Sequence, residues 1–91
     1  MSNSQNKAVL LGALKGWKIQ DNKLEKTFFF KTFDDVVVFF NFIAQIAIQM
    51  NHHPEFWTSY KTCKVMLFTH DLHEISKLDF DFARKIDEDY E

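Results

Sequence analysis

Apolar residues recur with a helical period in some parts of the 91-residue chain and alternate with polar residues in others. Residues 4–15 place their apolar side chains at helical spacing, and Gly16 stands where a short helix would end. In residues 17–20 and 23–30 apolar and polar side chains alternate instead. These two segments lie on either side of an Asp-Asn pair that is typical of a tight turn. The first third of the chain therefore predicts a helix followed by a β-hairpin.

The longest predicted helix runs from Phe33 to Met50, about 27 Å of α-helix, and Thr32 with Asp35 resembles the capping box that opens many helices. Its apolar residues are too many for one stripe. One face carries Val36, Phe39, Phe40, Ile43, Ala47 and Met50, and outside it lie Val37, Val38, Phe42, Ile46 and Ile48. A helix that is apolar nearly all round is buried on more than one side. Because so short a chain has little material to cover both sides, we expect an oligomer.

Residues 52–60 and 61–70 predict two further strands, the second with strict alternation of apolar and other side chains. A closing helix begins at Ser76, which forms another capping-box pattern with Asp79. We expect this helix to bury Leu78, Phe82 and Ile86. The order α-β-β-α-β-β-α favours an α+β fold, in which a four-stranded antiparallel sheet carries helices packed on one face.

The length predicts a single domain over residues 1–91, because a second core would leave each half too small to fold unaided. Hydrophobic residues make up 46% of the chain, which is ample for one core and excludes disorder. The single Cys63 has no partner for a disulfide. This lone thiol, and a start, MSNSQNK, without the apolar stretch of a secretory signal, lead us to expect a cytoplasmic protein.

Charge and hydropathy exclude two classes of partner. Eleven Lys and Arg against thirteen Asp and Glu give a net charge of −2. The basic surplus typical of nucleic-acid binding is missing, so we expect no direct nucleic-acid partner. The longest wholly apolar run covers only Val36 to Phe40, so we expect no membrane-spanning segment.

The candidate chemistry lies in the histidines that follow the long helix and the last strand. Pro54 pushes His53 into an extended conformation, so that His52 and His53 point to opposite sides and bracket a space. His70 ends the last predicted strand. Imidazole serves as acid and as base near neutrality, and imidazoles that share one pocket do not all carry charge together. Such a cluster would move protons on and off one substrate.

Plainer interpretations stay open at this point. The His52-His53-Pro54 segment alone is more typical of a helix-terminating turn with two surface imidazoles. Zinc binding is disfavoured, because adjacent histidines seldom converge on one ion and no second cysteine assists, so we expect no metal. Asp79 has a purely structural alternative as the cap of its helix.

Taken together, these segments resemble the pterin-4a-carbinolamine dehydratase family. The matching stretch is MNHHPEFWTSYKTCKVMLFTHD followed by SKLD, with His52-His53-Pro54-Glu55 and an aromatic residue, then Thr69-His70 and an acidic residue. The leading helix, the Phe-rich strand and the closing helix also follow the family order. The His-His-Pro-Glu-aromatic motif combined with Thr-His-acid at this distance is a specific signal, and the resemblance covers nearly the whole chain.

The resemblance implies dimers or tetramers and a pterin substrate, 4a-hydroxytetrahydropterin, from which water is eliminated to give a quinonoid dihydropterin without a metal or redox cofactor. It makes His52, His53 and His70 the catalytic histidines, with His52 and His70 transferring protons and His53 holding the pterin. Asp79 corresponds to an active-site carboxylate that would orient His70. Substrate contacts are implied at His52, His53, Pro54, Thr69, His70, Asp71, Leu72 and Asp79.

One position departs from the family pattern. Ile48 stands one helical turn before His52, where many members carry Glu. Isoleucine neither raises the pKa of a histidine nor binds a polar ligand edge. The alternative function is therefore a non-catalytic pterin-binding or protein-dimerisation module on the same scaffold.

Overall fold

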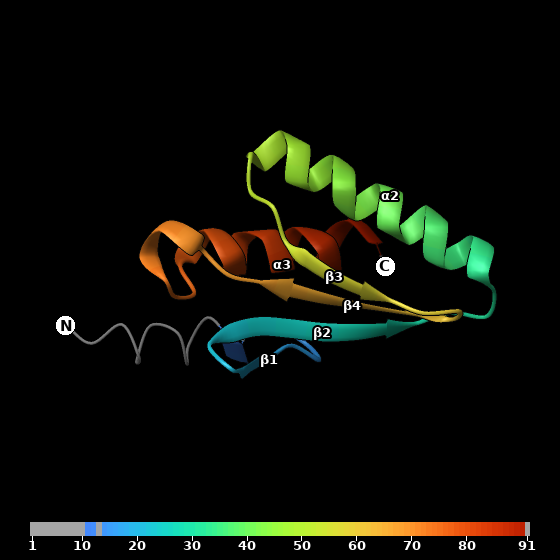
Figure 1. Ribbon diagram of the computed structural model, residues 1–91, viewed down its shortest axis with the longest axis horizontal. Helices are drawn as coiled ribbons and strands as arrows, with labels where there is room; N and C mark the ends of the chain where they lie inside the picture. The colour runs from blue at the N-terminus through green and yellow to red at the C-terminus, as the bar shows by residue number, and fades with distance from the viewer. Residues whose placement is uncertain (1–10, 13, 91) are drawn as a thin grey trace.

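The computed structural model describes residues 11, 12 and 14–90. Two helices and four strands make up most of it (Figure 1). In chain order they are β1 (Lys18–Gln20), β2 (Lys23–Phe29), α2 (Phe33–Met50), β3 (Glu55–Thr58), β4 (Thr62–Leu67), the 3-10 turn η1 (His70–Leu72) and α3 (Lys77–Tyr90). The predicted helix over 4–15 falls mostly outside the described residues, although Leu11 and Gly12 are helical.

The strands form one antiparallel sheet in the order β1-β2-β4-β3. Both α2 and α3 lie on the same side of this sheet (Figure 1). The predicted α+β class, with an antiparallel sheet and helices on one face, is thereby confirmed. The second pair of strands is shorter than predicted, because the segment around Pro54 precedes β3 and the residues after Leu67 turn away from the sheet.

The core lies between the inner face of the sheet and the two helices. On β4 the alternation predicted from the sequence places Cys63, Val65 and Leu67 inward, without exposed surface, and Leu24 of β2 pairs with Leu67. Burial raises the pKa of the Cys63 thiol to about 11. At neutral pH the thiol is therefore protonated and serves as a small core side chain.

The bounds of α2 are those predicted, and the Thr32 hydroxyl accepts a hydrogen bond from the Asp35 backbone N–H as its N-cap. The predicted face is rotated, however: Ile46 is buried and Phe40 is partly exposed. By length and composition α2 could cross a membrane, a possibility that counting unbroken apolar runs did not reveal. The core helix of a globular domain meets the same test, and here its buried residues complete the core against the sheet and α3.

Helix α3 buries Phe82 and Ile86 as expected, but the prediction for Leu78 is wrong. Leu78 is 36% exposed, whereas the neighbouring Asp79 has no exposed surface. Leu78 and Asp79 point about 100° apart around the helix, and it is Asp79 that faces the interior, next to the buried Phe80. The Asp79 carboxylate takes the inner position because its hydrogen-bond partners, His52, Thr69 and Ser76, lie there.

The sheet faces differ enough to be tested with one pair of variants. Leu24→Ala removes a fully buried side chain and should lower the free energy of unfolding by about 2–5 kcal/mol. Phe29→Ala, on the outer face with its side chain 77% exposed, should change it by less than about 0.5 kcal/mol. Urea denaturation of both variants measures the difference. Equal effects would show that the inner face has been misassigned.

Candidate active site

The end of α2 fixes the direction of the first histidine. Asn51 adopts the left-handed conformation (φ 51°, ψ 44°), and its N–H donates to the carbonyls of the preceding turn. The His52 N–H donates to the Ala47 carbonyl at 3.1 Å. This pattern is a Schellman-type helix end, in which Asn is one of the few side chains tolerated. His52 is consequently directed inward and only 8% exposed, while His53 lies at the surface.

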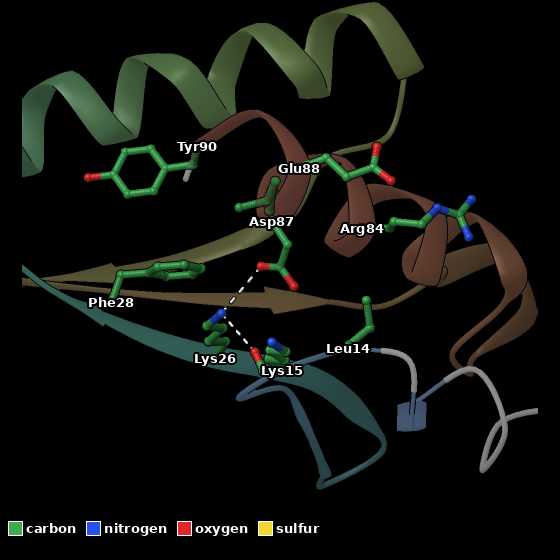
Figure 2. Close-up of a pocket in the computed structure, with 9 residues that line it drawn as sticks. Leu14, Lys15, Lys26, Phe28, Arg84, Asp87, Glu88 and Tyr90 are labelled. Carbon is green, nitrogen blue, oxygen red and sulfur yellow. Dashed lines mark hydrogen bonds and ion pairs between the residues drawn. The ribbon is translucent and has the colours of Figure 1, made fainter.

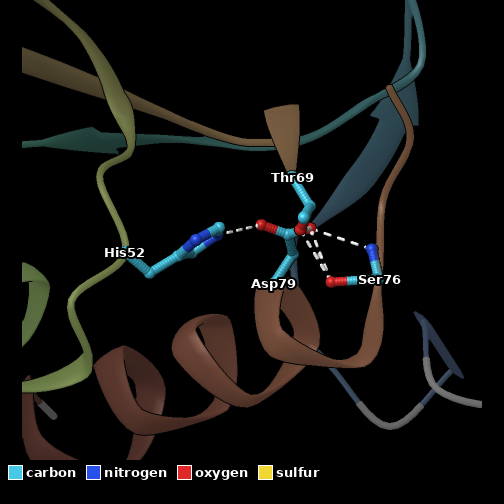
Figure 3. Close-up of polar contacts among 4 residues, drawn as sticks. All are labelled: His52, Thr69, Ser76 and Asp79. Carbon is cyan, nitrogen blue, oxygen red and sulfur yellow. Dashed lines mark hydrogen bonds and ion pairs between the residues drawn. The ribbon is translucent and has the colours of Figure 1, made fainter. Parts of the chain in front are cut away.

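The buried partner of His52 is Asp79. The His52 ring Nε2 lies 2.5 Å from Asp79 Oδ1, across the space between the end of α2 and the first turn of α3 (Figure 3). Sequence reasoning assigned Asp79 to orient His70, and the structure corrects this assignment. The reason is geometric, because His70 lies beyond the end of β4 on the surface, whereas His52 faces the inner side of α3.

Two further residues hold the other oxygen of this carboxylate. The Thr69 hydroxyl donates to Asp79 Oδ2 at 2.7 Å, and the Ser76 backbone N–H donates to the same oxygen at 2.9 Å (Figure 3). The hydrogen bond from the Ser76 N–H is one half of the capping box predicted from the sequence. Since Thr69 uses its proton on Asp79, the Ser76 hydroxyl donates to Thr69 Oγ1, 2.7 Å away. Capping and contact with a site histidine are therefore compatible roles for Asp79.

His70 is carried by a tight loop that β4 leads into. Thr69 and Glu74 form an isolated antiparallel bridge, and His73 between them adopts the left-handed conformation. From the β1–β2 turn, the Asn22 amide donates to the His73 carbonyl at 2.9 Å. These contacts hold the exposed His70 at the start of η1, with its ring edge-on to Phe68.

These segments enclose a surface hollow of about 210 Å³. Its lining is Asn51, His52, His53, Thr69, His70, Asp71 and Leu78. The structure thus brings together the three predicted histidines, from two stretches of chain far apart in sequence, with two of the predicted substrate contacts. The remaining predicted contacts, Pro54, Leu72 and Asp79, are not in this lining. Sequence reasoning missed Asn51 and Leu78, because the first was an unremarked cap position and the second was taken for core.

A larger hollow of about 440 Å³ lies between α3 and β2 (Figure 2). Several polar groups in and beside it bond to one another. Lys26 Nζ donates to the Lys15 carbonyl at 2.8 Å and to Asp87 at 3.3 Å, and the Trp17 indole N–H also donates to Asp87. It contains none of the predicted site residues. We therefore take the histidine-lined hollow as the candidate active site.

The chemistry available in this hollow is proton transfer. It offers one buried imidazole fixed by a carboxylate and two exposed imidazoles. Within residues 11, 12 and 14–90, no group of three or more His, Cys, Asp or Glu side chains is arranged to hold a metal ion. Acid and base groups on opposite sides of one small ligand suit an elimination or addition of water.

Comparisons with known proteins show what family the chain is similar to. The family model for pterin 4 alpha carbinolamine dehydratase matches residues 1–88. A Sulfurisphaera tokodaii protein named as a candidate pterin-4-alpha-carbinolamine dehydratase is 45% identical over 86% of this chain and 84% of its own. The crystal structure of a transcriptional coactivator/pterin dehydratase from Brucella melitensis has a TM-score of 0.86 and 31% identity, covering 97% of this chain and 95% of that one. A pterin dehydratase-like RuBisCO assembly factor of the α-carboxysome shares the fold at a TM-score of 0.69 and 20% identity, over 80% and 87% of the two chains.

A double-mutant cycle tests which histidine Asp79 holds. His52→Ala and Asp79→Ala should show a coupling of about 1–3 kcal/mol in the free energy of unfolding, because the two side chains are in direct contact. The matched cycle with His70→Ala should be additive within about 0.5 kcal/mol. Chemical denaturation of the parent, the single variants and the double variants supplies both numbers. Coupling to His70 instead of His52 would restore the original assignment.

Proposed function

The chain belongs to the pterin 4 alpha carbinolamine dehydratase family, and from this premise we propose that it eliminates water from 4a-hydroxytetrahydropterin to give a quinonoid dihydropterin. The observation that carries the proposal is the single hollow shared by His52, His53 and His70. Elimination of water requires a proton to leave one position as hydroxide leaves another. Groups on more than one side of the ligand meet this requirement.

The contact with Asp79 supports a role for His52 as the base. A carboxylate only accepts hydrogen bonds, so the neutral imidazole places its proton on Nε2 and leaves Nδ1 as an acceptor. In the proposed reaction Nδ1 takes the proton from N5 of the pterin, and Asp79 stabilises the imidazolium that results. The structure thereby supports one tautomer of His52 through a buried hydrogen bond.

His70 is proposed as the acid that donates a proton to the departing 4a-hydroxyl, which leaves as water. Proton-transfer groups of this kind contribute about 10²–10⁴ in rate. His53 is proposed to hold the pterin ring and to stabilise the developing cation. As an exposed residue of the lining, Asp71 is available to contact the ligand directly, as proposed for the segment Thr69–Leu72. Contacts from Pro54 stay a prediction.

The proposed elimination is complete without an electron carrier or a metal, because a proton and a hydroxide leave the substrate together as water. We propose a role in recycling a pterin cofactor after its oxidation by a hydroxylase. A cytoplasmic location stays a prediction that rests on the single buried thiol Cys63.

The activity can be tested with one pair of histidine variants. His70→Ala should lower the rate of 4a-hydroxytetrahydropterin loss at least tenfold, because it removes the proposed acid. His73→Asn should leave the rate within about twofold, since His73 lies in the same loop but outside the hollow and Asn tolerates its left-handed backbone. Stopped-flow absorbance against the uncatalysed reaction measures both. A His70→Ala rate equal to that of the parent would contradict the proposal.

The alternative, a non-catalytic pterin-binding or dimerisation module, was motivated by Ile48. In the structure Ile48 is 68% exposed and does not line the hollow, so its presence leaves the three imidazoles in place. This placement favours the dehydratase. If the parent binds a reduced pterin without dehydrating it, and Ile48→Glu creates turnover, the binding module is the correct function.

We also propose that the chain assembles as a homodimer or homotetramer through the outer apolar face of α2. This face consists of Val37, Val38, Phe40 and Ile48, all exposed on the side that does not pack on the core. Exposed apolar patches of this kind mark interaction sites. A second copy supplies an apolar face of the same kind, which makes helix-to-helix packing the simplest occupant.

Substitution within this face tests the assembly. Val37→Lys should shift the protein toward monomer at micromolar concentration, because burying an unpaired ammonium is costly. Gln20→Lys adds the same charge on β1 and should leave the assembly unchanged. Sedimentation velocity gives the mass of each form. A parent that is monomeric at micromolar concentration would rule out the proposed interface.

A further inference from the structure

We infer that Asn51 is a specificity-determining residue that binds the polar pyrimidinone edge of the pterin through its side-chain carboxamide. The inference rests on the proposed function, since it names the group that reads the ligand in that same hollow. Neither the sequence motif nor the proton-transfer mechanism requires Asn51. The inference follows from the position of Asn51 in the lining and from its free carboxamide oxygen and NH₂.

The backbone of Asn51 is already fixed before any ligand binds. Its left-handed conformation and the hydrogen bonds of its N–H end α2, and the next residue is held by the contacts of His52. Asn51 therefore lines the hollow from an anchored backbone position. A group held in place loses less conformational entropy when it binds a ligand.

Two of the other polar groups of the lining are committed to Asp79. The Thr69 hydroxyl donates to Asp79, and the Nε2 of His52 also contacts Asp79. Leu78 offers only apolar surface. Among the described residues, by contrast, the Asn51 carboxamide has no hydrogen-bond partner, so its oxygen and its NH₂ are both available.

A carboxamide matches the edge of a pterin chemically. The pyrimidinone ring presents an N3–H donor beside a C4 carbonyl acceptor. The amide oxygen of Asn accepts from N3–H while its NH₂ donates to the C4 carbonyl, which makes a bidentate pair. Asn and Gln read the edges of nucleic-acid bases in the same way. Imidazoles and a carboxylate, the other available groups of the hollow, each offer only part of this pattern.

The test compares Asn51→Gly with the parent in calorimetric binding of a stable tetrahydropterin and of its N3-methyl derivative. Glycine keeps the left-handed helix end without strain, so the variant should fold with an unchanged circular dichroism spectrum. It should bind tetrahydropterin about tenfold or more weakly than the parent. The N3-methyl ligand cannot make the bidentate pair and should bind the two proteins equally.

Equal affinity of Asn51→Gly and parent for tetrahydropterin would overturn the inference. So would an equal loss of affinity for both ligands, which would indicate a general distortion of the hollow. Because binding is measured without turnover, a protein that binds tetrahydropterin through Asn51 but fails to dehydrate its 4a-hydroxy form supports this inference while refuting the proposed activity. Failure of the parent to bind either ligand would overturn both.

Discussion

The carboxylate of Asp79 has no exposed surface, and the elements around the hollow are arranged to bond it. Leaving such a charge buried without partners would cost several kcal/mol. Its partners come from three places: His52 after α2, Thr69 after β4, and Ser76 before α3. One buried group therefore joins the ends of three elements, and the positions of the hollow's walls follow from that requirement.

Local features of the fold could be predicted because they depend on local chemistry. The Thr32 cap and the period of the apolar residues set the bounds of α2, and alternation set the inward face of β4. The rotation of a helix about its axis is different, since it depends on which neighbours surround it. Ile46 and Leu78 were placed on the wrong sides because the sequence pattern does not show where the sheet and the polar partners lie.

The same division holds for the candidate site. The resemblance and the extended segment around Pro54 predicted that imidazoles from two distant stretches would meet, and they line one hollow. The partner of Asp79 could not be predicted, because His52 and His70 are both far from it in sequence and a capping role already explained the carboxylate. Asn51 was missed for a related reason, since its role in ending a helix already explained why Asn stands at this position.

Helix α2 has three roles that meet at its C-terminal end. Its inner face completes the core, its outer apolar face offers a packing surface, and its last turn leads directly into the hollow. Ile48, the last residue of the outer face, precedes Asn51 by three residues, about one helical turn. A second copy packed on this face would therefore lie beside the site. It would restrict fraying of the last turn, on which the positions of Asn51 and His52 depend, so assembly and ligand recognition would be coupled through one helix end.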